Sequence, residues 1–168
     1  ERKHLARPDV GLETHIQDIV NQIEVADLRD VILVADGYGG VPVTGAADRL
    51  VDRLASVVYV DTGPIPADTA FIDFEPEQRA ATEQKVAEQG DGWLIPPISV
   101  EELAEAMPDE TPERVAAIVA RMTPQPFGTY TEPLRLSNPA LATVPKVAVL
   151  NSFPESVVRE LMAAGHPI

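Results

Sequence analysis

The sequence predicts an α/β protein with a parallel sheet and a helical insertion. Three short runs rich in β-branched residues have the length and composition of buried strands. They span residues 30–34, 55–61 and 146–150. Segments with helical spacing alternate with these runs, which favours parallel strands joined by right-handed crossovers. The stretch from Thr62 to Ala142 has a weak strand signal and is expected to form a helical insertion between two strands.

The first element along the chain is a helix expected at residues 12–26. Its apolar side chains recur at helical spacing and leave a polar opposite face. These residues are Leu12, Ile16, Ile19, Val20 and Ile23. The next run, "DVILV" at 30–34, suits a strand buried on both faces of a parallel sheet. A glycine-rich turn at 36–40 then leads into a helix expected at 41–53.

The insertion after the second strand contains three helical segments separated by proline-rich stretches. They lie near 75–89, 100–107 and 111–122. Insertions in such sheets usually cover a site at the carboxyl ends of the strands. We therefore assign 1–61 and 143–168 to the core of the fold and 62–142 to a helical lid, with a purely structural cap as the alternative. A last helix is expected at 155–164, where a glycine and then a proline follow to end it.

The composition excludes several classes of function. The 168 residues include 13 Lys and Arg against 27 Asp and Glu, for a net charge of -14, and such a surface repels nucleic acids and anionic membranes. The chain has no cysteine, which excludes disulfides, zinc–thiolate sites and thiol catalysis. No stretch approaches the roughly 20 apolar residues that span a bilayer, and no signal peptide is visible. We expect a single-domain cytoplasmic protein without a cofactor.

The segment "VILVADGYGGVPVTG" at 31–45 has the layout of a catalytic turn. A strand that reverses sharply into a helix needs small residues at the corner, where other side chains would collide with the backbone. The helix that follows directs its N-terminal N–H groups and the positive end of its dipole at the corner. A group held at the corner is therefore exposed and faces donors that stabilise an anion, as in the G-x-S-x-G nucleophile elbow.

The residues around this turn resemble those of α/β-hydrolases. "LETHIQDIVNQIEVADLRDVILVADGYGGVPVTGAADRL" is similar to the branch that contains plant methylesterases, hydroxynitrile lyases and their bacterial esterase relatives. "VVYVDTGPIPAD" resembles the next strand and the entry to the lid, and "PKVAVLNSFPESVVRELMAAGHP" resembles the following strand and helix. The resemblance covers nearly the whole chain and implies an α/β-hydrolase sheet with a helical lid, derived from a small-molecule ester hydrolase.

The sequence departs from that family at the turn itself. Alignment on the Tyr-Gly-Gly of the turn puts Ala35 where the family has glycine, Asp36 where it has histidine, and Gly37 where it has the serine nucleophile. Glycine has no side chain and cannot form an acyl-enzyme. The family's strands with the oxyanion motif would precede Glu1, and its catalytic histidine would follow Ile168. The resemblance therefore implies the middle of a hydrolase whose serine has been replaced.

Two aspartates are candidates for acid chemistry. Asp36 could act as a nucleophile, but it stands one residue before the position that carries the nucleophile in dehalogenases of this fold. Its alternative role is a carboxylate that hydrogen-bonds N–H groups of the turn. Asp61 ends the second strand, where some α/β-hydrolases carry the acid that orients the catalytic histidine. Its alternative role is to cap the turn "DTGP".

Four aromatic residues are candidates for substrate contacts. By the family resemblance, the backbone N–H of Tyr38 is an oxyanion donor. Trp93, Phe127 and Tyr130 lie in the insertion and could line an apolar pocket, or they could simply pack the core of the lid.

The three histidines offer no obvious general base. His15 is expected to pack beside the apolar face of the first helix, His4 lies in a polar opening, and His166 comes too early for the family's catalytic histidine. Neither histidines nor carboxylates have the spacing of metal ligands, so no metal site is expected.

Three functions remain open at this stage. The main prediction is an esterase-family protein present as a fragment or an inactivated variant. The second is a natural non-catalytic relative that binds a small apolar ligand under the lid. The third is a lyase or another non-hydrolytic activity with Asp36 or Asp61 as acid or base. The expected partner is a small-molecule ester or apolar ligand, and a homodimer is also considered.

Overall fold

The computed structural model describes residues 3–74 and 76–150, together with Ser156 and Arg159. The chain divides into two compact units. The unit that we call the sheet unit comprises Leu12–Phe71 and Glu132–Ile168, and the unit that we call the helical unit comprises Glu1–Gly11 and Ile72–Thr131. The insertion predicted from the sequence thus contains most of the helical unit.

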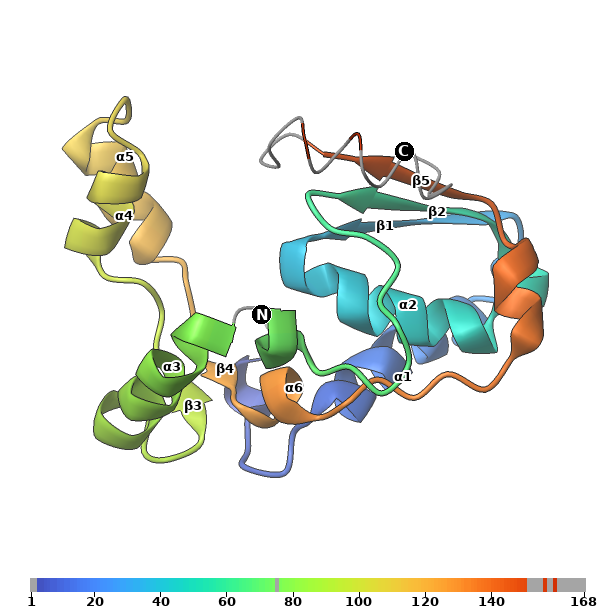
Figure 1. Cartoon of the computed structure of the whole chain (residues 1–168), viewed down its shortest axis with the longest axis horizontal. Coiled ribbons are helices and arrows are strands. Elements are labelled where there is room, and N and C mark those ends of the chain that lie inside the picture. The colour runs from blue at the N-terminus through green and yellow to red at the C-terminus, as the bar shows by residue number, and fades with distance from the viewer. Residues whose placement is uncertain (1–2, 75, 151–155, 157–158, 160–168) are drawn as a thin grey trace. The chain divides into compact units, whose positions relative to one another are not determined.

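The sheet unit is built on three parallel strands (Figure 1). They are β1 (Val31–Asp36), β2 (Leu54–Val60) and β5 (Lys146–Val149), in the order β1-β2-β5. Val34 of β1 pairs with Val58 of β2, and Val58 pairs in turn with Val147 of β5. The predicted three-stranded parallel sheet is therefore confirmed.

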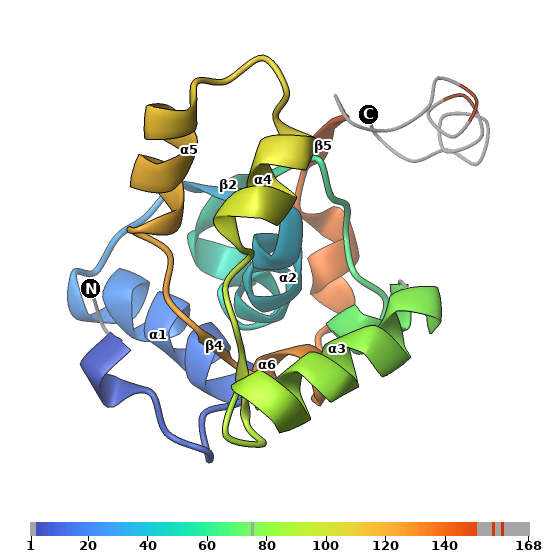
Figure 2. The same ribbon diagram turned by 90° about the vertical axis from the view of Figure 1, so that its left-hand side faces the viewer.

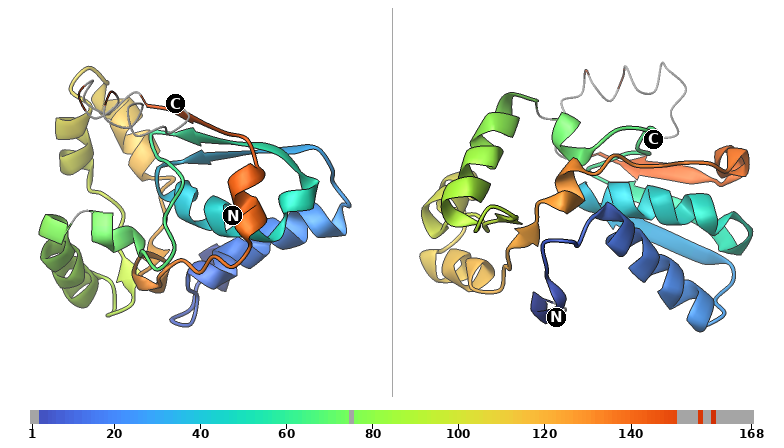
Figure 3. Two further views of the ribbon diagram at one scale, coloured as in Figure 1. Left: turned by 45° about the vertical axis from the view of Figure 1, so that its right-hand side comes forward. Right: turned by 90° about the horizontal axis from the view of Figure 1, so that it is seen from below.

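Two helices cover one face of this sheet (Figure 3). They are α1 (Leu12–Val25) and α2 (Gly40–Arg49), and a short 3-10 turn at Val51–Arg53 follows α2. Of the five residues on the predicted apolar face of α1, all are buried except Ile19, which is half-buried. A Cβ atom at Gly45 would lie 2.4 Å from Cδ1 of Ile16, so the glycine allows α2 to approach α1 closely.

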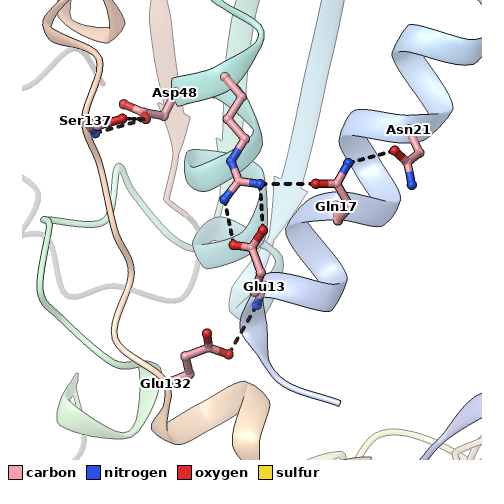
Figure 4. Close-up of polar contacts among 7 residues, drawn as sticks. Glu13, Gln17, Asn21, Asp48, Glu132 and Ser137 are labelled. Atoms are coloured by element: carbon pink, nitrogen blue, oxygen red, sulfur yellow. Dashed lines mark hydrogen bonds and ion pairs between the residues drawn. The ribbon is translucent and has the colours of Figure 1, made fainter. Parts of the chain in front are cut away.

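Hydrogen bonds between exposed polar side chains connect α1 to α2 (Figure 4). The guanidinium of Arg49 donates to both carboxylate oxygens of Glu13, at 2.6 and 2.7 Å. It also donates to Gln17 at 3.4 Å, and Gln17 donates to Asn21 at 2.7 Å. The hydrogen bonds from Arg49 lower the pKa of Glu13 below its usual value. Because the Glu13 side chain is 56% exposed, we expect the ion pair to contribute at most about 1 kcal/mol.

The other face of the sheet is open to solvent along the described chain. Side chains alternate across a strand, and α1 and α2 both lie against the side to which Leu33 and Ala35 turn. Ile32 and Val34 on the other side are 60% and 63% exposed. The expectation that this strand is buried on both faces is therefore wrong for the described residues, although the strand itself is where the sequence places it.

The helical unit contains four α-helices and a small antiparallel pair of strands among its described residues (Figure 2). The helices are α3 (Pro76–Gln89), α4 (Val100–Ala106), α5 (Pro112–Val119) and α6 (Gly128–Thr131), and β3 (Leu94–Ile95) pairs with β4 (Gln125–Pro126). Ser99 caps α4 in a capping box with Glu102, and Thr111 caps α5. The helical segments expected near 75–89, 100–107 and 111–122 are thus helical, with a shorter last one.

The first and last residues of the insertion, 62–71 and 132–142, belong to the sheet unit, and we call these two segments the arms of the insertion. The two arms are hydrogen-bonded to each other. The N–H of Leu134 donates to the carbonyl of Thr69, and the N–H of Asp68 donates to the carbonyl of Leu134. These bonds join the two arms to each other, and Leu134 is fully buried in the core of the sheet unit. That residues 62–142 act as a lid stays a prediction. The helix expected at 155–164 lies largely outside the described residues.

Candidate functional site

The turn between β1 and α2 has the backbone geometry of a sharp corner. Asp36 is still extended, with φ -129° and ψ 131°, and Gly37 then turns into the left-handed region with φ +51°. Gly37–Gly39 form one 3-10 turn, and the N–H of Gly40 donates back to the carbonyls of Gly37 and Tyr38. The predicted turn that leads directly into a helix is therefore confirmed. The reversal is concentrated at Gly37, where a side chain would be conformationally strained.

The space around the corner differs sharply between neighbouring glycines. A Cβ atom at Gly37 or at Gly39 would meet no atom within 4 Å. A Cβ atom at Gly40 would lie 2.5 Å from Oγ1 of Thr62, on the segment that follows β2. Position 37 therefore has room for a side chain although its backbone suits glycine, whereas position 40 has to be small because Thr62 passes against it.

The side chain of Tyr38 connects the turn to α1. Its hydroxyl is hydrogen-bonded to Nδ1 of His15 at 2.9 Å, and its ring meets the rings of His15 and Phe71 edge-on at centroid distances of 5.9 and 5.4 Å. Burial lowers the pKa of His15, and the charge of Asp18 partly opposes this effect. His15 is thus a half-buried packing residue, as the sequence indicates, and its hydrogen bond to Tyr38 was not foreseen.

Asp36 and Asp61 lie at the same edge of the sheet as the turn. The last pair of the β1–β2 ladder is Asp36 with Val60, so Asp61 follows directly at the carboxyl end of the neighbouring strand. Asp61 has φ +47°, and its N–H donates to the carbonyl of Val149 on the third strand. The register thus brings Asp36, Gly37 and Asp61 to one edge. The catalytic roles of these residues stay predictions.

The three aromatic residues predicted for a substrate pocket gather in the helical unit. The N–H of Phe127 donates to the carbonyl of Trp93 at 2.7 Å, and the N–H of Tyr130 donates to the carbonyl of Phe127 at 2.9 Å. All three are half-buried. Their role in binding substrate stays a prediction. His4 belongs to the same unit, and His166 lies outside the described residues.

Two polar residues on the buried side of α2 were not predicted from the sequence. Thr44 donates to the carbonyl of Gly40 at 2.7 Å, and its hydroxyl lies 3.0 Å from the hydroxyl of Tyr59. Because the single hydrogen of Thr44 is already used, Tyr59 must donate to it. Asp48 is only 4% exposed and accepts hydrogen bonds from residues 137 and 138. The signal that could have revealed both is their spacing of four residues on a helix of small, apolar residues.

Within the residues that the structure describes, no group of three histidine, cysteine or carboxylate side chains could hold a metal ion. Over the same residues, no helix is both long and apolar enough to cross a membrane.

Comparison with solved structures identifies the fold. An extracellular α/β-hydrolase from a Paenibacillus species, described as sharing structural and functional homology with tobacco Salicylic Acid Binding Protein 2, superposes with a TM-score of 0.75 and 18% identity. The superposition covers 89% of this chain and 63% of that protein. The chain has the α/β-hydrolase fold. A pyrethroid hydrolase, PytH, matches the same α/β-hydrolase fold with a TM-score of 0.60 and 19% identity, over 95% of this chain and 66% of its own.

One curated protein is similar in sequence to part of this α/β-hydrolase-fold chain. The carbendazim hydrolyzing esterase of Nocardioides sp. (strain SG-4G) is 49% identical over 61 residues, which are 36% of this chain and 25% of the esterase. The chain thus matches about a quarter of that relative and less than two thirds of the Paenibacillus hydrolase. No protein-family model matches the sequence.

Proposed function

We propose that this chain derives from a small-molecule ester hydrolase and is inactive in ester hydrolysis because Gly37 occupies the nucleophile position. The observation that carries the proposal is the geometry of Gly37. It lies between β1 and α2 with φ +51° and open space around its missing Cβ atom. A nucleophile elbow holds its side chain in such a strained, exposed corner. The similarity to an esterase over 61 residues also supports this origin.

In an active relative, a serine at position 37 would attack the carbonyl carbon of the ester. A histidine would take the serine proton and later deliver it to the leaving alcohol. Backbone N–H groups of the turn that leads into α2, including that of Tyr38, would hold the oxyanion. Asp61, at the carboxyl end of the neighbouring strand, could orient the histidine. With glycine at position 37 the first step has no attacking atom, whatever the remaining groups do.

The second candidate function is binding of a small apolar ligand without catalysis. Its support is the group of half-buried aromatic residues Trp93, Phe127 and Tyr130 in the helical unit, a composition typical of ligand pockets. A lyase based on Asp36 or Asp61 has weaker support, because the side chain of Asp36 is exposed at the strand end, one residue before the corner. In every case the expected partner is a small molecule, and the net charge of -14 disfavours nucleic acid.

The test uses a fluorophosphonate probe and p-nitrophenyl acetate. The unmodified chain should show no covalent labelling and no turnover. Gly37→Ser should restore little activity, because a serine hydroxyl needs a general base. Of the described histidines, His4 belongs to the helical unit, and Nδ1 of His15 is already hydrogen-bonded to the hydroxyl of Tyr38. Gly39→Ser is the matched control, because position 39 is equally open and follows the corner.

Two results would contradict this proposal. Robust hydrolysis by the unmodified chain that is lost in Asp36→Ala would mean that the turn carries aspartate chemistry. Faster labelling of Gly39→Ser than of Gly37→Ser would mean that position 37 is not the nucleophile position of the turn, because both positions are equally open. Robust turnover by Gly37→Ser alone would support position 37 and show that a histidine of this chain serves as the base.

A further inference from the structure

The sheet unit contains a cleft that the function above does not use. It has a volume of about 570 Å³, within the range typical of small-molecule sites, and all residues that line it belong to the sheet unit. One wall is the segment Pro64–Pro66 and the other runs from Leu136 to Ala142. Thr44 and Asp48 of α2 also line the cleft.

This cleft is separate from the turn at Gly37. Gly40 begins α2 beside the turn, and Asp48 lies eight residues further along the same helix. At 1.5 Å per residue, the two residues are about 12 Å apart along the helix axis. Thr44, the lining residue of α2 nearer to the turn, lies about 6 Å from Gly40 along the axis, so a ligand in the cleft would contact the middle and the C-terminal half of α2.

Most of the polar groups that line the cleft already bind one another. The carboxylate of Asp48 accepts from the N–H of Ser137 at 3.0 Å and from its hydroxyl at 3.3 Å (Figure 4). It also accepts from the N–H of Asn138 at 3.0 Å. The side-chain amide of Asn138 donates back to the carbonyl of Asp48. The hydroxyl of Thr44 donates to Gly40 and accepts from the hydroxyl of Tyr59 and from the N–H of Ile65. The negative charge of Asp48 is thus held by three donors, and the walls of the cleft are mainly proline and aliphatic side chains.

Lys146 is the cation of this cleft. Its ammonium donates to the carbonyls of Leu141 and Val144, at 2.6 and 2.9 Å. An ammonium has three donors, so these two bonds leave one for a ligand. Within the described part of the chain, Lys146 takes part in no ion pair. Burial lowers its pKa, and no carboxylate contributes to the shift. The cleft therefore joins an apolar surface to a partly desolvated cation that has no counter-ion among the described residues.

We propose that this cleft is a binding site for small monocarboxylates with an apolar body, whose carboxylate pairs with Nζ of Lys146 while the body lies between Pro64–Pro66 and Leu136–Ala142. A carboxylate at this position accepts the remaining N–H of the ammonium in a charge-assisted hydrogen bond. The apolar body removes the proline and leucine side chains from water. A neutral molecule of the same shape gains only the burial of apolar surface and lacks the charge-assisted hydrogen bond.

The test compares hexanoate with hexanol, which has the same carbon chain and no charge. Lys3, Lys85 and Lys146 are the lysines of the chain, so a protein labelled with 13C at lysine Cε gives three resolvable signals. Saturating hexanoate should raise the pKa of Lys146, because the carboxylate stabilises the charged form. Lys85 is the internal control, since it lies in the helical unit and already pairs with Glu102 at 2.6 Å. Hexanol should leave the pKa of Lys146 unchanged or lower it.

Variants then test whether binding depends on the positive charge of the side chain at position 146. Lys146→Met keeps an unbranched side chain without charge and should weaken hexanoate binding about tenfold, the effect of one partly buried charge-assisted hydrogen bond. Lys146→Arg should retain most of the affinity, and Lys85→Met should match the unmodified chain. Hexanol should bind all four proteins equally, with amide shifts in residues 64–66 and 136–142.

Several outcomes would overturn this inference. Equal affinity for hexanoate in Lys146→Met and in the unmodified chain would remove the cation from the site. A fall in the pKa of Lys146 on addition of hexanoate would show that the ligand desolvates the ammonium without pairing to it. Hexanoate-induced amide shifts outside the two walls would place the ligand elsewhere. The pKa measurement uses the unmodified protein, so the inference can be refuted even if a variant fails to fold.

Discussion

The conformation of Gly37 predicts how alanine substitutions at the turn should differ. Gly37 has φ +51°, whereas Gly39 has φ -54° and ψ -21°, which any residue adopts. A Cβ atom meets nothing within 4 Å at either position, so packing does not distinguish the two substitutions. Both replace glycine by alanine, so the loss of unfolded-chain entropy is the same and cancels in the comparison. The difference between them therefore measures the left-handed backbone strain.

We expect Gly37→Ala to be less stable than Gly39→Ala by about 1–2 kcal/mol, the usual cost of a left-handed conformation for an alanine. Gly39 is also the N-cap of α2, where alanine is roughly 0.5–1 kcal/mol worse than glycine, and this reduces the expected difference by that amount. Gly37→Asn should fall between the two, because asparagine tolerates the left-handed region better than alanine.

The assay is equilibrium unfolding in urea followed by circular dichroism at 222 nm. Two-state unfolding of the sheet unit would give the difference directly from the midpoints, provided that the m-values agree. In a thermal scan, 1 kcal/mol corresponds to a shift of about 2–4 °C for a chain of this size. Equal stability of Gly37→Ala and Gly39→Ala would refute the assignment of strain to position 37, and with it the argument that the corner is held in the geometry of a nucleophile elbow.

Three other predictions concern packing and pH. Gly45→Ala should destabilise the protein by about 1–3 kcal/mol, seen as a lower urea midpoint, because the new methyl group overlaps Ile16. The pKa of His15 is lower in the folded state than in the unfolded state. The contribution of neutral His15 to the free energy of unfolding is therefore fully present above pH 6.5 and is lost as the pH falls through the pKa of the folded state. The variant His15→Gln should lose this pH dependence of the free energy of unfolding. The folded state also lowers the pKa of Glu13, so the stability from its pair with Arg49 is present above pH 4.5 and is lost below it; Glu13→Gln should remove this acid dependence, which a series of melts at pH 3–7 would measure.

The elements that the sequence predicted are those with a strong local signal. The run "VILVA" and the apolar spacing of α1 define a strand and a helix without reference to the rest of the chain. The position of Gly37 in a turn between a strand and a helix followed from the glycine-rich run "DGYGG" directly after the apolar strand. These signals are local, because each depends on residues within one turn or one strand.

The features that the sequence did not predict depend on distant parts of the chain. Asp48 meets Ser137 and Asn138 across about 90 positions, and no local pattern marks such a contact. The exposure of Ile32 could not be predicted from strand composition, since composition does not show which side the neighbouring helices occupy. β3 and β4 have two residues each, too few for a periodic pattern.

The hydrogen bonds between the two arms of the insertion affect which changes in sequence and length the fold can accept. Because backbone bonds join Thr69 and Asp68 to Leu134, the chain leaves the sheet unit and returns to it at neighbouring points. A segment with adjacent exit and return points can be lengthened, shortened or exchanged without moving the strands on either side. Residues 72–131 therefore form a replaceable module, and a short Gly–Ser loop grafted between Phe71 and Glu132 should leave the β1–β2–β5 sheet in place. Evolution can change the module while the turn at Gly37 keeps its position.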